Sequence, residues 1–167
     1  MVDIPTKAIF NEATFSSCKK YRYILARTFA TGTGIINFIM LNPSTATEQY
    51  NDPTVARCEN RSISMGYKQM IVTNIFAYRA TDPKLLLKIS DPIGADNDKA
   101  IIDSAQKSNK IICAWGEYGK LLNRGDHVRQ LLKLNSNNNI YCLKLNKSGE
   151  PAHPLYLSNK LVAKEYI

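Results

Sequence analysis

Long apolar runs are missing from this sequence of 167 residues. The longest extends from Ile35 to Leu41, is interrupted by Asn37, and is far shorter than the roughly 20 residues that span a bilayer. The first residues, 1–5 (MVDIP), lack the basic and then continuously apolar pattern of an export signal. We therefore predict a cytoplasmic protein with no membrane segment.

Closely spaced cysteines are missing as well. The chain has four cysteines that lie far apart, Cys18, Cys58, Cys113 and Cys142. None of them forms the C-x-x-C pairs that organise zinc or iron–sulfur sites. Cys113 and Cys142 stand within apolar runs, which is typical of small buried hydrophobic residues. We expect neither a metal nor another cofactor.

Charge is unbalanced, but no dense basic run is present. Lysine and arginine number 22 against 14 acidic residues, so the formal net charge is +8. A positive surface attracts polyanions, and counterion release favours nucleic acid as the partner. Because the lysines are scattered, ordinary solvated side chains are the alternative interpretation. The chain also lacks repeats and linkers, and its length predicts one domain over residues 1–167, acting as a monomer.

The first strands are predicted near the N-terminus. Tyr21 to Phe29 alternates and is rich in β-forming residues, and residues 31–34 (TGTG) supply a turn before Ile35 to Leu41. These runs predict an N-terminal hairpin over about residues 20–41. The second run is apolar nearly throughout, which is typical of a central strand buried on both faces.

Strands and helices are then predicted in alternation. The strands are expected at 70–76, 110–115 and 140–145, and the helices at 54–65, 84–89, 96–108 and 127–134. Such alternation implies right-handed crossovers between parallel strands. The sequence therefore predicts an α/β fold of three layers, α/β/α, around a mainly parallel sheet.

Polar residues directly follow several of the predicted strands. In open α/β sheets, ligands bind beyond the carboxyl ends of the strands. Four points of this kind occur, at Asn42-Pro43-Ser44, at Asn74 with Tyr78-Arg79, at Trp115-Gly116 and at His153-Pro154. If the strands are parallel, these points meet at one edge of the sheet. We expect the functional site there, built mainly from the Asn42 and His153 loops.

Each point also has a plain structural interpretation. Asn42 can cap a helix while Pro43 stiffens a turn, and a lone histidine such as His153 is often a surface residue. Arg61 and Arg79 can be solvated charges, and a tryptophan is usually partly buried packing. No single residue identifies the site.

Taken in order, the loops resemble motifs of the uracil-DNA glycosylase superfamily, in which a strand leads into a G-x-N-P or related loop and an H-P-S loop follows later. The first motif is residues 40–44 (MLNPS), with Met40 where glycine is usual. The second is residues 153–158 (HPLYLS), with Leu155 where serine is common. Residues 72–79 (VTNIFAYR) resemble the strand with the base-reading asparagine, and residues 111–116 resemble the apolar strand that ends in glycine. The resemblance covers roughly residues 34–158 and implies a uracil-DNA glycosylase-like fold.

The same motifs, extended to L-N-P-S-T-A, N-D-P-T, N-I-F-A-Y-R-A-T-D-P, A-W-G and H-P-L-Y-L, also resemble an uncharacterised family of bacterial and phage proteins known as a domain of unknown function.

The glycosylase resemblance implies a role for several residues. Asn42 would orient the attacking water, and His153 would donate a hydrogen bond to the departing base. Asn74 would read the edge of a flipped pyrimidine, with Pro43 in the base pocket and Tyr50 or Phe76 as the stacking aromatic. The candidates for DNA contacts are Ser44, Arg57, Arg61, Arg79 and Pro154.

Three functions therefore remain open. The first is a DNA glycosylase that removes a flipped uracil or modified base, as in base-excision DNA repair. The second is an enzyme that processes free nucleosides or nucleotides, for which a closed pocket would suffice. The third is a non-catalytic nucleic-acid-binding module with an inherited base pocket, which the departures at Met40 and Leu155 suggest.

Overall fold

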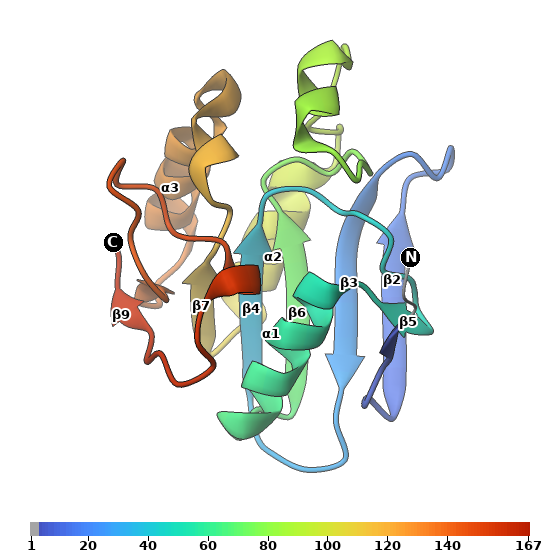
Figure 1. The fold of residues 1–167 in the computed structure, drawn as a ribbon, viewed down its shortest axis with the longest axis vertical. Helices are drawn as coiled ribbons and strands as arrows, with labels where there is room; N and C mark the ends of the chain where they lie inside the picture. The colour runs from blue at the N-terminus through green and yellow to red at the C-terminus, as the bar shows by residue number, and fades with distance from the viewer. Residues whose placement is uncertain (1–3) are drawn as a thin grey trace.

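The computed structural model describes residues 4–167, whose strands form a seven-stranded sheet and a two-stranded one. The large sheet has the order β2 (Phe10–Phe15), β3 (Arg22–Thr28), β6 (Gln69–Asn74), β4 (Ile35–Met40), β7 (Lys110–Cys113), β8 (Ile140–Cys142) and β9 (Lys164–Glu165). Figure 1 shows most of this order from right to left. The small sheet pairs β1 (Ile4–Pro5) with β5 (Tyr50–Asn51).

The large sheet is mixed, which corrects the prediction of a mainly parallel one. Its four central strands, β6, β4, β7 and β8, are parallel. The outer strands β2, β3 and β9 pair antiparallel with their neighbours. The reason is that the chain enters the sheet through a hairpin and leaves it through the C-terminal tail, and neither connection contains a crossover helix. The α/β class itself is correct.

The predicted hairpin over residues 20–41 is wrong. β3 and β4 do not pair, because β6 lies between them, antiparallel to β3 and parallel to β4. The 31–34 segment passes under the end of the first helix: Thr33 N donates to Gly66 O at 3.0 Å, and a Cβ on Gly32 would lie 2.7 Å from that oxygen. The real hairpin joins β2 to β3. It was missed because β2 is exposed on alternate residues and carries polar side chains.

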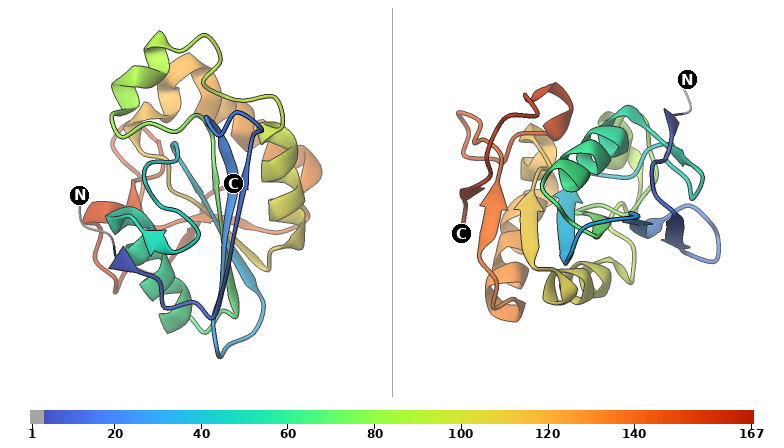
Figure 2. Two further views of the ribbon diagram at one scale, coloured as in Figure 1. Left: turned by 90° about the vertical axis from the view of Figure 1, so that its right-hand side faces the viewer. Right: turned by 90° about the horizontal axis from the view of Figure 1, so that it is seen from below.

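Helices cover both faces of the sheet, as Figure 2 shows. α1 (Pro53–Ser64) lies on one face, and α2 (Asn97–Lys107) and α3 (Arg124–Asn135) lie on the other. Along β4, Phe38 and Met40 pack with Val55 of α1, whereas Ile39 packs with Ile101 of α2. Burial on both faces explains why the strand is apolar throughout.

Short 3₁₀ helices occupy the loops near the carboxyl ends of the parallel strands. They are η1 (Pro83–Lys88), η2 (Glu117–Asn123) and η3 (Pro154–Tyr156). η1 replaces the helix that was predicted at 84–89, and α1, α2 and α3 correspond to the other three predicted helices. In the described part of the chain, no helix has both the length and the apolar character needed to cross a membrane.

Candidate functional site

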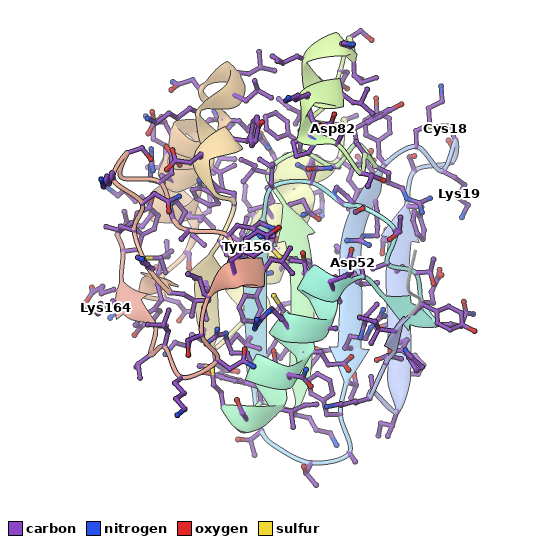
Figure 3. All side chains as sticks on the ribbon, viewed as in Figure 1. Cys18, Lys19, Asp52, Asp82, Tyr156 and Lys164 are labelled. Atoms are coloured by element: carbon purple, nitrogen blue, oxygen red, sulfur yellow. The ribbon has the colours of Figure 1, made fainter. Side chains whose placement is uncertain are left out.

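A cavity of about 570 Å³ opens where the parallel strands end. Its walls come from Arg22 of β3 and from five further segments, namely 40–45 at the end of β4, 52–55 at the start of α1, 80–83 before and at the start of η1, 115–118 after β7, and 153–156 at η3. Figure 3 labels Asp52 at the start of α1 and Tyr156 on η3, both on the face of the sheet that α1 covers. The structure thus brings Asn42 and His153 to the walls of one cavity.

The side chain of Asn42 is held by the backbone around it. Its Nδ2 donates to Pro43 O at 3.1 Å and to Ala80 O at 2.7 Å. Ala80 N donates in turn to Pro43 O at 2.9 Å, which fixes the loop. No described residue donates to Asn42 Oδ1, so this oxygen remains free to accept a hydrogen bond from a ligand or a water in the cavity.

His153 begins η3 and is held in one orientation. Its Nδ1 accepts a hydrogen bond from Leu155 N at 3.4 Å. Burial lowers the pKa of His153 below its ordinary value, and the charge of Asp52 opposes this shift only in part. The neutral ring whose Nδ1 is an acceptor carries its hydrogen on Nε2. His153 is therefore a neutral donor at neutral pH.

The His153 loop is anchored to the strand end that faces it. Trp115 is buried, and its Nε1 donates to Glu150 Oε2 at 2.6 Å. Gly116 N donates to Pro151 O at 2.8 Å, and Gly116 has φ +76°, a conformation that favours glycine. A Cβ on Gly116 would lie 3.4 Å from the Cβ of His153. These contacts, none of which was predicted, hold the segment that leads to His153 against the residues that follow β7.

Three charged residues of the cavity wall were also missed, Arg22, Asp52 and Glu117. Arg22 of β3 is 1% exposed, and its Nη1 donates to Ala46 O at 2.8 Å. Burial lowers the pKa of Arg22 to about 10, against the opposing effect of Asp52, so the guanidinium stays charged at neutral pH. Asp52 is 9% exposed and accepts from Val55 N at 2.8 Å, which caps α1. Only the D-P-T capping pattern and an arginine at the start of a β-rich run pointed to the positions of Asp52 and Arg22.

Hydroxyl groups and aromatic rings complete the lining of the cavity. Four lining residues carry a hydroxyl group that makes no hydrogen bond to another described residue: Ser44, Thr45, Thr54 and Thr81. Tyr118 and Tyr156 also line the cavity, and they are 41% and 87% exposed. Exposed aromatic rings at a cavity mouth are suited to stacking on a nucleobase.

Several predicted base-contacting residues lie outside the cavity. Phe76 is fully buried in the core between the sheet, α2 and α3, so it cannot stack on a ligand. Tyr50 belongs to β5 and Pro43 is buried in the Asn42 loop, and neither residue lines the cavity. Asn74 is 1% exposed, does not line the cavity, and its amide atoms have no partner among the described residues. Base reading by Asn74 is not available in this geometry.

Most of the predicted phosphate-binding residues are engaged within the chain. Arg57 donates to Leu157 O and Asn159 Oδ1, and Arg61 is buried and donates to Ser158 O, Asn159 O and Leu161 O. The two guanidinium groups thus fasten the segment that follows η3. Arg79 donates to Lys19 O and lies over the ring of Phe15. Pro154 is buried at the start of η3, so Ser44 alone of this set lines the cavity.

Metal ligands do not cluster in the described part of the chain, where no three His, Cys, Asp or Glu side chains are grouped as a metal site would require. In a comparison with known families, residues 22–155 match the family described as "Protein of unknown function (DUF1643)". This range contains both loops and nearly every residue of the cavity wall. No curated protein and no solved structure matches the chain.

Proposed function

The chain belongs to this family of unknown function, and we propose that its cavity hydrolyses the N-glycosidic bond of a nucleotide whose base enters it. One observation carries the proposal. A single cavity is lined by Asn42, whose Nδ2 is held while Oδ1 accepts from no described residue, and by His153, whose Nδ1 accepts from Leu155 N and leaves Nε2 as the donor. Water must be held on one side of the sugar carbon and the base oxygen on the other, and these groups suit the two tasks.

Asn42 would position the water. An amide oxygen is too weak a base to remove a proton, but it can accept a hydrogen bond and so direct the water oxygen at C1′. Asn42 Nδ2 donates hydrogen bonds to two carbonyl groups, so the amide cannot turn its nitrogen toward the water. The new bond joins the water oxygen to C1′ of an oxocarbenium-like sugar, and the proton of the water is lost to solvent.

His153 would stabilise the leaving group. As the C1′–N bond breaks, its electron pair passes to the base, and negative charge grows on the base oxygen. A donor in a partly buried site stabilises that charge more than water would. The lowered pKa of His153 keeps the ring neutral, so it supplies a hydrogen bond without first taking up a proton.

The substrate can be a nucleic-acid strand or a free nucleoside or nucleotide. The net charge of +8 favours a nucleic-acid strand. Against this, Arg57, Arg61 and Arg79 are bonded to carbonyl groups of the chain itself, which favours a free nucleoside or nucleotide. Both substrate classes therefore belong in the test.

The test is a base-release assay. The protein is incubated with single- and double-stranded DNA that carries uracil, hypoxanthine, mismatched thymine or hypermodified bases, and with the corresponding free deoxynucleosides. Abasic sites and free bases are then measured. We expect release from at least one of these substrates, and absence of release from all of them would refute the proposal.

A pair of variants separates catalysis from binding. Asn42→Ala removes the proposed water ligand, and Asn135→Ala at the exposed C-terminal end of α3 is its matched control. We expect release to fall in the first variant and to stay unchanged in the second. If Asn42→Ala is as active as the wild type, Asn42 does not position the water.

A further inference from the structure

Arg22 is a buried charge that the described part of the chain does not neutralise. No carboxylate lies within 4.0 Å of its guanidinium in residues 4–167, and Nε has no hydrogen-bond partner there. Removing a charged group from water without a compensating partner is unfavourable. Nε itself is covered, but Arg22 lines the cavity, so a ligand there can accept a hydrogen bond from the part of the guanidinium that reaches it.

Asp52 lies on the same wall but does not neutralise Arg22. It is the charge that most opposes the lowered pKa of Arg22, so the two groups are neighbours. They are nevertheless too far apart for an ion pair. The cavity wall therefore presents a hydrogen-bond donor beside an acceptor, with both groups nine-tenths or more buried.

We infer that Arg22 and Asp52 together read the edge of the base that enters the cavity, and that they select bases with a carbonyl oxygen beside a ring N–H. The inference rests on the proposed function, because it assumes that a base is the ligand. Arg22 donates to the carbonyl oxygen, and Asp52 accepts from the N–H. Uracil, thymine, hypoxanthine and guanine present this edge, whereas cytosine and adenine present an amino donor beside a ring acceptor.

Charge in the cavity favours a neutral edge over a phosphate at this wall. Asp52 and Glu117 both line the cavity, so a phosphate drawn to Arg22 would enter a cavity that already contains two carboxylates. A base edge carries no net charge and satisfies Arg22 and Asp52 together. Arg22 of β3 and Asp52 at the start of α1 therefore take the base-reading role that the sequence predicted for Asn74, which lies outside the cavity.

The test is a binding measurement with nucleosides that resist cleavage. An electron-withdrawing fluorine at C2′ destabilises the oxocarbenium-like state, so 2′-fluoro-2′-deoxyuridine and 2′-fluoro-2′-deoxycytidine bind without reacting. Titration calorimetry of the full chain gives both dissociation constants. We expect the uridine analogue to bind at least about tenfold more tightly, since a site built for one hydrogen-bond pattern leaves buried groups unpaired with the other.

Variants assign the preference to the two residues. Asp52→Asn keeps a good helix cap, so the protein should still fold, but the amide replaces an acceptor with a donor. Arg22→Met keeps the apolar stem of the side chain and removes the donor. Both should reduce the preference to about twofold or less, while Arg79→Met, outside the cavity, should leave it unchanged.

Equal binding of the two analogues, no binding of either, or a preference that survives both variants would overturn the inference. These outcomes are separable from failure of the proposed function. Preference without base release would refute the hydrolysis alone, and base release without preference would refute the reading by Arg22 and Asp52 alone.

Discussion

Arg22 and Arg27 stand on the same strand, and both are almost completely buried, but their surroundings differ. Arg27 donates to Asn51 Oδ1 and to Thr47 O, and Glu59 lies 4.0 Å away. Arg22 donates to one carbonyl group and faces the cavity. The contrast shows two roles of a buried charge. Arg27 is neutralised inside the protein and stabilises the fold, whereas Arg22 is left to bind a ligand.

Replacing Arg27 should produce the largest loss of stability. Arg27→Met leaves the Glu59 carboxylate buried without its nearby positive charge, although Thr6, Lys7 and Asn51 still donate to it. Breaking a buried pair in this way costs about 3–5 kcal/mol. Urea unfolding measures the free energy directly, and a loss below about 1 kcal/mol would show that Arg27 is not compensated as described.

Trp115, which lines the cavity, and Glu150 form a second satisfied pair. Trp115→Phe keeps an aromatic ring but removes the donor to Glu150, whose carboxylate retains only Arg129 at 3.6 Å. An unsatisfied buried acceptor costs about 1–3 kcal/mol. We expect that loss in urea unfolding, together with slower base release, because the His153 loop follows Glu150. Tyr118→Phe at the exposed rim is the control, and equal stability of the two variants would contradict the anchoring role.

Arg22→Met should change stability least of the core substitutions. Because Arg22 has no carboxylate partner, replacing it with an apolar side chain leaves no opposite charge unpaired. We expect the free energy of unfolding to stay within about 1 kcal/mol of the wild type or to rise. The comparison fails if Arg22→Met and Arg27→Met lose equal stability.

The smallest effect concerns pH. Burial holds the pKa of His153 below its ordinary value, so the unfolded chain takes up this proton first as the pH falls. The stability contributed by the neutral ring is complete above about pH 6.5 and is lost as the pH falls toward the lowered pKa of the folded state. His153→Ala should therefore flatten the decrease in stability on the acid side of neutrality. Identical pH profiles for the variant and the wild type would show that burial does not hold His153 neutral.

Local pattern predicted the central part of the fold. The run predicted at 35–41 contains β4 (Ile35–Met40), which is buried on both faces, and Asp52 with Pro53 starts α1 as such a pair should. The strand order could not be predicted. β6 lies between β3 and β4, and the 31–34 segment that connects β3 to β4 packs against Gly66. The local sequence pattern does not indicate which distant segments make such contacts.

The site was predictable only in part, for a related reason. The positions of Asn42 and His153 after strands placed both at the same edge of the sheet. The direction of a side chain depends on its neighbours, so Asn74 could equally well have faced the cavity or the interior. The sequence did not indicate that Arg22 lines the cavity, because its burial and position depend on contacts with the loop at Ala46 and with the start of α1.

The measurement that tests the central claim most directly is the rate of base release under single-turnover conditions for wild type, His153→Ala and His127→Ala. The chain has two histidines, and His127 lies exposed on α3 beside Asp98, which makes it the matched control. We predict a loss of about 10²- to 10³-fold for His153→Ala, the usual effect of removing a donor to a developing negative charge. The rate for His127→Ala should equal that of the wild type. Equal rates for both variants would contradict the claim that His153 stabilises the leaving base.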